Sequence, residues 1–283
     1  MHRKTRKLSI RRHRKLPPPG PWQCHPKNPG GPHGCVPLAE LEAAAKRLGV
    51  VSQGRALRTA VVKALGLPPN AGERTLMGAL KLGSADALLR PAYPEAWKAD
   101  PDKWLDSNDI SKCLSQWEES NQEFEFMGPY PIDFAVPDPY SKGAHGETKC
   151  LISEMCSLRV KEAIKNGTKA IGIVYNLDPH YKSGSHWVAN YIDLEKSRCY
   201  YFDSYGMAPP KQVATFMKWL TTHDPKMKLE YNARRHQYKN TECGVYCIYF
   251  IIRMLLGDQF QQFTRRRPTD ADMLRIRDWL FST

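Results

Sequence analysis

The segment from Gly244 to Leu256 is almost continuously apolar and is followed by Gly257. Glycine commonly ends a helix, so we predict a helix there. No apolar run in the 283 residues approaches the length of a membrane span. The apolar content of 41% suffices for a globular core. We therefore expect this helix to lie in one sizeable globular domain.

The segments upstream and downstream of that helix alternate between strand and helix patterns. Aromatic and β-branched runs predict strands at 170–175, 187–193, 199–203 and 229–232. Apolar spacing predicts helices at about 150–165, 210–221 and 269–281, the last capped by Thr269, and another entered through Asp106 or Ser107. Residues 127–149 resemble a loop because they are rich in proline and glycine. The pattern over residues 100–283 predicts an α+β fold with a short central mixed sheet flanked by helices.

The first 90 residues differ from the rest. Residues 38–90 carry three apolar stripes at helical spacing, which predict a small helical arm. Residues 1–37 are basic and then rich in proline and glycine, and we expect a disordered tail there. A zinc site is an alternative for the four residues Cys24, His25, His33 and Cys35, although their spacing fits no common zinc finger.

The net charge of +13 is concentrated at the N-terminus. Eight basic residues and no acid lie in the first 15 positions: Arg3, Lys4, Arg6, Lys7, Arg11, Arg12, Arg14 and Lys15. Three interpretations stay open, namely a solvated tail, a nucleic-acid or other polyanion contact, and a nuclear address. The N-terminus has no apolar stretch after its charges, so it does not resemble a secretory signal. We therefore expect a reducing compartment and unpaired cysteines.

Four residues supply the groups that a thiol protease needs, in the chain order His186, Asp203, Gln237 and Cys243. A helix N-terminus favours a thiolate, and Cys243 directly precedes the apolar helix. An imidazole accepts the thiol proton, an acid orients the imidazole, and an amide stabilises the oxyanion. Each residue alone is more often an ordinary structural residue. Glu242 also disfavours a thiolate unless its side chain points away from Cys243.

The ordered set resembles the ubiquitin-like-protease and adenovirus-protease clan of cysteine peptidases. The motifs that carry the resemblance are His186-Trp187, Asp203-Ser204, and Gln237 followed by Cys243-Gly244. The context Arg235-His236-Gln237 with Thr241-Glu242 is similar to the polyprotein-processing branch of large DNA viruses. The resemblance covers roughly residues 100–283. In that viral branch Asn can stand at the position of Asp203, whereas deconjugating members have Asp.

The resemblance implies a papain-like core with a catalytic set of His186, Asp203, Gln237 and Cys243. It also implies that Trp187 and Trp104 wall a narrow channel and that Gly244 lies near the substrate. Such a channel admits only glycine at the two positions before the scissile bond. Core packing is the alternative for Trp104.

We expect a thiol endopeptidase that cleaves viral structural polyproteins after Gly-Gly during virion maturation, in the host cytoplasm and the virion, with the nucleus as a further site. One alternative is a deconjugase for SUMO or another ubiquitin-like modifier, and a second is an inactive, nucleic-acid-binding virion scaffold. We expect no metal and no resident cofactor, with activation by DNA as an analogy from a related viral family. The oligomeric state stays open.

Overall fold

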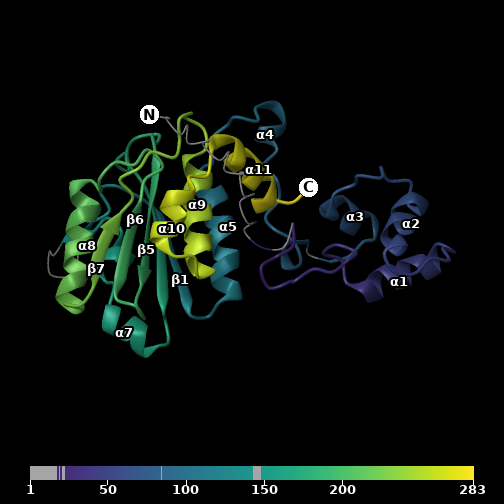
Figure 1. Ribbon diagram of the computed structural model, residues 1–283, viewed down its shortest axis with the longest axis horizontal. Helices are drawn as coiled ribbons and strands as arrows, with labels where there is room; N and C mark the ends of the chain where they lie inside the picture. The colour runs from purple at the N-terminus through teal and green to yellow at the C-terminus, as the bar shows by residue number, and fades with distance from the viewer. Residues whose placement is uncertain (1–17, 19, 21–22, 84, 143–147) are drawn as a thin grey trace, which may run out of the picture.

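The structure is a computed structural model that describes residues 18, 20, 23–83, 85–142 and 148–283. Figure 1 shows a larger body built on a sheet and a smaller helical unit beside it. The larger body starts near residue 96, and the smaller unit, which we call the arm, comprises residues 23–90. The basic residues expected to bind nucleic acid, at positions 3–15, lie outside the described residues.

The sheet of the larger body is mixed, as the sequence predicts. Its strands run in the order β1-β4-β5-β6-β7. They are β1 (Phe124–Pro131), β4 (Ala170–Asn176), β5 (Trp187–Asp193), β6 (Arg198–Phe202) and β7 (Lys228–Tyr231). The outer pairs β1-β4 and β6-β7 are parallel, whereas β4-β5 and β5-β6 are antiparallel.

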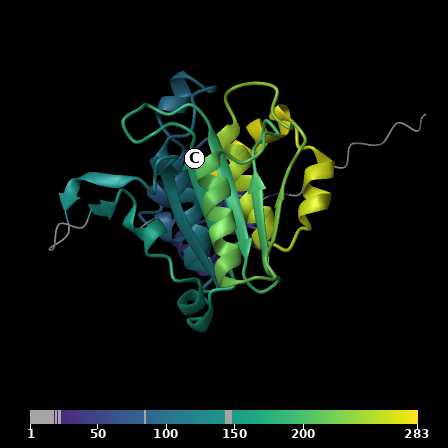
Figure 2. The ribbon, with the colours of Figure 1, turned by 90° about the vertical axis from the view of Figure 1, so that its left-hand side faces the viewer.

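Helices cover both faces of this sheet (Figure 1). One face carries α5 (Ser107–Ser120), α9 (Cys243–Leu255), α10 (Phe260–Arg266) and α11 (Asp270–Leu280). The other face packs against α8 (Lys211–His223), which lies in front of the strands in Figure 2, and against Val160 of α7 (Val160–Lys165). The predicted apolar helix is α9, and 11 of its residues are buried, so it is the central helix of the body.

Two helix starts follow the sequence prediction. Asp106 caps α5 and Thr269 caps α11, each through a capping box with the acid three residues later. In both cases a side-chain oxygen accepts an otherwise unpaired amide N–H of the first turn. These caps fix where α5 and α11 begin, and both helices contact α9.

The prediction of a loop at 127–149 is wrong in part. β1 continues to Pro131, because a register shift between Met127 and Tyr130 takes up Gly128 and Pro129 at the edge of the sheet. β2 (Pro137–Lys142) and β3 (Thr148–Cys150) form a separate antiparallel ribbon, which projects from the body in Figure 2. The single helix predicted at 150–165 is two short ones, α6 (Ser153–Cys156) and α7.

The arm is built from α1 (Leu38–Arg47), α2 (Ala56–Ala64) and α3 (Glu73–Ala79). Each helix ends in the same way, with a leucine cap followed by a residue at positive φ: Leu48-Gly49, Leu65-Gly66 and Leu80-Lys81. Backbone N–H groups past each end donate back to the last turn. This arrangement satisfies carbonyls that a helix end leaves unpaired. Two short helices, η1 (Ala85–Ala87) and α4 (Ala96–Ala99), lead into the larger body.

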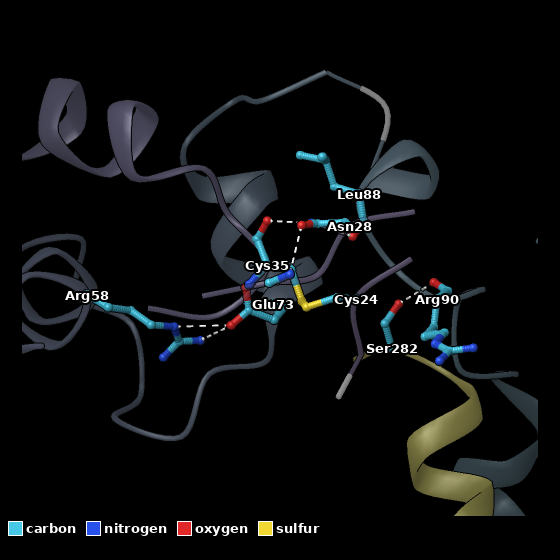
Figure 3. The surroundings of a disulfide bond; sticks show 9 residues. Cys24, Asn28, Cys35, Arg58, Glu73, Leu88, Arg90 and Ser282 are labelled. Atoms are coloured by element: carbon cyan, nitrogen blue, oxygen red, sulfur yellow. Dashed lines mark hydrogen bonds and ion pairs between the residues drawn. A yellow bond between two sulfur atoms is a disulfide. The ribbon is translucent and has the colours of Figure 1, made fainter. Parts of the chain in front are cut away.

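The segment before α1 is part of the arm, which corrects the tail boundary expected at residue 37. Cys24 and Cys35 form a disulfide and are buried in the core of the arm (Figure 3). Glu73 accepts from the amide of Cys35 and pairs with Arg58. The zinc alternative is therefore wrong, because both thiols are used in the disulfide. The expectation of unpaired cysteines is also wrong for Cys150 and Cys156, which form a second disulfide.

The arm and the body meet along the linker and the last residues of the chain. The Ser282 hydroxyl donates to the carbonyl oxygen of Arg90 at 2.7 Å (Figure 3), and the amide of Arg74 donates to Thr283. From the body, Gln116 of α5 donates to the carbonyl oxygen of Leu89. These contacts tie the segment after α11 to both units. None of the helices in the described ranges is long and apolar enough to cross a membrane.

Candidate active site

Two adjacent antiparallel strands bring His186 and Asp203 together. Ala189 of β5 pairs with Phe202 of β6, so His186 just before β5 and Asp203 just after β6 lie at the same end of the sheet. His186 Nε2 is 2.8 Å from Asp203 Oδ1, and both residues are buried. The backbone N–H and C=O of Asp203 are both held by the Asn232 side chain. Asn232 therefore holds the backbone of Asp203 in place independently of the contact with the imidazole.

The surroundings of His186 favour its charged form. Burial lowers the pKa of His186, but hydrogen bonds to Asp203 and Cys243 and the negative charges of those two groups outweigh burial and raise it to about 9. An imidazolium held beside a thiolate is the resting state of an activated cysteine nucleophile. The site therefore favours an imidazolium at neutral pH.

Cys243 is the first residue of α9, at the end of the helix that carries the partial positive charge of the helix dipole. Cys247, one turn later, is fully buried, and burial raises the pKa of its thiol well above the usual value. Of the two cysteines in this helix, only Cys243 contacts an imidazole. The helix thus carries one thiol in contact with an imidazole and one thiol enclosed in the core.

The Glu242 side chain points toward Arg277 rather than toward Cys243. The carboxylate is therefore paired and does not disfavour a thiolate at Cys243 in the way that its position in the sequence suggests. Its carboxylate accepts two hydrogen bonds from Arg277 of α11, at 2.6 and 3.1 Å. The guanidinium also donates to the carbonyl oxygen of Pro101 and lies 4.3 Å from the ring centroid of Trp97. Arg277 therefore compensates the charge of Glu242 inside the protein.

Gln237 has a free amide donor at this site. Its Oε1 accepts from the Ser204 hydroxyl at 2.6 Å, while Nε2 is buried and has no hydrogen-bond partner among the described residues. The amides of His236 and Gln237 both donate to the Ser204 carbonyl oxygen, which holds the loop in place. A buried, oriented N–H donor without a partner is suited to an oxyanion.

A groove of about 480 Å³ adjoins the site and is lined by Trp104 and Trp187. Trp104 is 38% exposed, so core packing does not describe it. Trp187 is buried and donates from its indole N–H to the carbonyl oxygen of Leu105. Gly244 does not line the groove but packs behind it, where an added Cβ would lie 3.0 Å from Leu105 Cβ and 3.3 Å from Trp187 Cδ1. The glycine therefore lets α9 approach the wall closely.

Several supporting residues were not predicted from the sequence. Asn232 holds Asp203, Ser204 orients Gln237, and Tyr205 stacks on the His186 ring. Arg277 neutralises Glu242 from a distant helix. Ser204 lies in the Asp203-Ser204 motif, and that adjacency is the signal that could have identified it. The residues described by the structure include no group of three or more His, Cys, Asp or Glu side chains that could hold a metal ion.

The C-terminal part of the chain is similar to known cysteine proteases. Residues 169–281 match the family model described as "Ulp1 protease family, C-terminal catalytic domain". A "Putative thiol protease R355" of Acanthamoeba polyphaga mimivirus is 29% identical over 194 residues, which are 66% of this chain and 59% of the relative. A "SUMO-1 cysteine protease" of African swine fever virus is 34% identical over 128 residues, which are 42% of this chain and 46% of the relative. The matches thus span about half the length of these relatives.

The fold itself is similar to a solved structure. A crystal structure of an African swine fever virus protease aligns with a TM-score of 0.61 at 19% sequence identity. That alignment covers 94% of this chain and 97% of the other, so it includes the arm as well as the body. At this identity the likeness concerns the fold alone, and it agrees with the predicted α+β architecture.

Proposed function

We propose that this chain is a cysteine endopeptidase of the Ulp1 protease family, whose model matches residues 169–281, and that it cleaves viral structural polyproteins after Gly-Gly during virion maturation. The observation that carries the proposal is the grouping of His186, Asp203 and Cys243. Gln237 is held to Ser204, the residue after Asp203, and its Nε2 has no partner among the described residues. A charged pair and a vacant donor are the two requirements for attack on a peptide carbonyl.

The proposed reaction uses each group in turn. The Cys243 thiolate attacks the carbonyl carbon of the second glycine, and the carbonyl oxygen, now negative, accepts a hydrogen bond from Gln237 Nε2. The His186 imidazolium gives its proton to the leaving amine as the C–N bond breaks, which leaves a thioester. The neutral imidazole then takes a proton from water, and the resulting hydroxide attacks the thioester. Release of the acid restores the thiolate and the imidazolium, while Asp203 keeps the ring oriented throughout.

The preference for Gly-Gly rests on the two tryptophans of the groove. Trp104 and Trp187 present flat aromatic walls beside Leu105, which contacts the first turn of α9. Substrate side chains next to the scissile bond would collide with these walls, whereas two glycines let the backbone pass. The relatives named as viral thiol or cysteine proteases support cleavage by a cysteine nucleophile.

A deconjugase for a ubiquitin-like modifier is the second candidate. The observation that favours it is Asp203, since deconjugating members of the clan have Asp at this position. One viral relative is itself named a SUMO-1 cysteine protease. The same aromatic channel would accept the Gly-Gly end of a modifier, so the chemistry does not separate the two candidates.

Cleavage assays separate the candidates. Wild type and Cys243→Ala are incubated with Gly-Gly-Xaa peptides, with co-encoded structural polyproteins, and with a folded SUMO conjugate, and product N-termini are sequenced. We expect cuts after Gly-Gly in peptides and polyproteins and none with Cys243→Ala. Cleavage of the conjugate alone would favour the deconjugase. Absence of any Cys243-dependent cleavage would favour the third candidate, an inactive virion scaffold.

We further propose that the enzyme acts in the host cytoplasm and in the virion, with the nucleus as a further site. No resident cofactor is needed by the reaction as written. The basic residues 3–15 are suited to nucleic acid through charge alone, and in that case a polyanion would increase the local concentration of enzyme.

A further inference from the structure

Planar side chains form a column that begins at the catalytic imidazole. The ring of Tyr205 stacks on His186 with centroids 4.4 Å apart and 17° between the ring planes. The guanidinium carbon of Arg235 is 5.1 Å from the centroid of Tyr205 and 5.0 Å from that of Tyr238. Arg235 thus contacts two aromatic rings, and one of them covers the general base.

Arg235 also holds the residue that carries the oxyanion donor. Its Nε donates to the carbonyl oxygen of Gln237 at 2.6 Å. The backbone N–H of Tyr205 donates to Asp203 Oδ1, the same oxygen that contacts His186 Nε2. The side chain of Arg235 therefore joins the loop of Gln237 to a turn already fixed against Asp203 and His186.

The two loops lie in close contact at Gly206. A Cβ added to Gly206 would lie 2.5 Å from the carbonyl carbon of Arg234 and 2.6 Å from the amide nitrogen of Arg235. Gly206 has φ of 75°, which also favours glycine. A guanidinium can stack through its plane and donate from Nε at the same time, whereas the ammonium of lysine has no plane.

We propose that Arg235 is a positioning residue that aligns the Gln237 amide with the Cys243–His186 pair, and this inference rests on the proposed protease function. The role depends on the shape of the guanidinium rather than on its charge. Arg235 does not itself touch the reacting atoms, so it acts through Gln237.

The test compares Arg235→Lys, Gln237→Ala and the double variant with wild type. Arg234→Lys is the matched control, because the exposed Arg234 side chain forms no hydrogen bond or ion pair with any described residue. Two rates are measured: cleavage of a Gly-Gly-Xaa peptide, and alkylation of Cys243 by iodoacetamide. Alkylation needs the thiolate but no oxyanion donor, so it reports on the charged pair alone.

We expect Arg235→Lys to lower kcat about 10-fold or more and to change KM less than about 3-fold. This is the pattern expected when stabilisation of the oxyanion is lost, because that contact is made only in the transition state. Alkylation should stay within about twofold of wild type, because the charged pair is intact. In the Gln237→Ala background the lysine variant should add less than about a threefold loss, since residues that act as a unit are not additive. Arg234→Lys should match wild type.

Three results would overturn the assignment: wild-type kcat in Arg235→Lys, effects that multiply in the double variant, or a parallel loss of alkylation. If Arg235→Lys does not fold, Tyr238→Ala replaces it, since Tyr238 is 68% exposed and covers one side of Arg235. A kcat for Tyr238→Ala equal to wild type would then overturn the role. A wild-type enzyme that alkylates but cleaves no substrate would instead overturn the proposed function, and Arg235's role with it.

Discussion

The hydroxyl of Ser204 donates to Oε1 of Gln237 across 2.6 Å, and this contact determines which end of the amide is free. Because the oxygen is engaged, Nε2 is left as the donor without a partner in the described part of the chain. Ser204 is fully buried, so water does not replace its hydroxyl readily. One hydroxyl therefore orients the proposed oxyanion donor.

Ser204→Ala should lower kcat about 10-fold, and Gln237→Ala about 100-fold, because the first variant loosens the donor and the second removes it. KM should change little in either variant, since the contact is made to the developing charge. Steady-state kinetics on a Gly-Gly-Xaa peptide measure both. Wild-type kcat in Ser204→Ala would show that the amide is oriented by something else.

Asp203→Asn should move the alkaline limb of activity to lower pH. The pKa of His186 is raised to about 9, so the imidazolium is present below that pH and is lost above it. Replacing the carboxylate by a neutral amide removes a charge that favours imidazolium, and the limb should fall by roughly one pH unit or more. The measurement is kcat/KM between pH 6 and 10.

Asp133→Asn is the control for that experiment. Asp133 pairs with His180 at 2.7 Å, outside the catalytic set. Its substitution should leave the alkaline limb where it is. A limb unchanged in Asp203→Asn, or displaced equally in both variants, contradicts the assigned role of Asp203.

Arg277→Met should destabilise the protein by about 3–5 kcal/mol, because Glu242 would stay buried without a countercharge. Glu242→Gln leaves the buried guanidinium of Arg277 without its countercharge and should also destabilise the protein. The double variant should recover much of the loss, since no unpaired charge remains. Denaturant unfolding monitored by tryptophan fluorescence measures all three. Simple addition of the two single losses in the double variant would contradict a coupled pair.

The Cys24–Cys35 disulfide should stabilise the arm. In the chain-entropy picture a loop of this length contributes about 3 kcal/mol, and the double serine variant should lose it. Limited proteolysis should then cut first within residues 23–37, while the larger body resists. Reductant should make wild type behave like the variant and leave the variant unchanged. Equal protease resistance of all samples would show that the arm does not need the bond.

Deletion of residues 1–15 should weaken binding to duplex DNA and reduce its salt dependence. Eight cations are removed, so the slope of log K against log salt should fall by up to about seven. A full-length variant with all eight changed to Gln is the matched control and should behave like the deletion. Unchanged binding and slope would assign the tail another role.

The sequence was most informative where local signals act. The caps at Asp106 and Thr269, the helix that starts at Cys243, and the adjacent strands that bring His186 to Asp203 each depend on a few neighbouring residues. The edge strand through Pro131 was missed because proline and glycine usually indicate a loop. Here a register shift at an edge accommodates them.

Contacts between residues far apart in the chain could not be predicted from the sequence. Nothing in the spacing of Glu242 and Arg277 indicates that they meet, since a buried ion pair depends on how α11 packs against α9. The pairing of Cys24 with Cys35 was also open, because the same residues allowed a loop or a metal site. Arg235 was noticed as part of a motif, but its contacts with Tyr205 and Gln237 required the fold.

The pairing of Glu242 with Arg277 also determines when, during synthesis of the chain, the surroundings of Cys243 are completed. A ribosome completes α9 before it makes α11, so a nascent chain first carries Cys243 beside a carboxylate that has no countercharge. Arg277 and the contacts of Pro101 and Trp97 with it form only after the final helix has left the exit tunnel. Cys243 thus acquires its finished surroundings only after residues 270–280 have been made, and a chain without α11 lacks them.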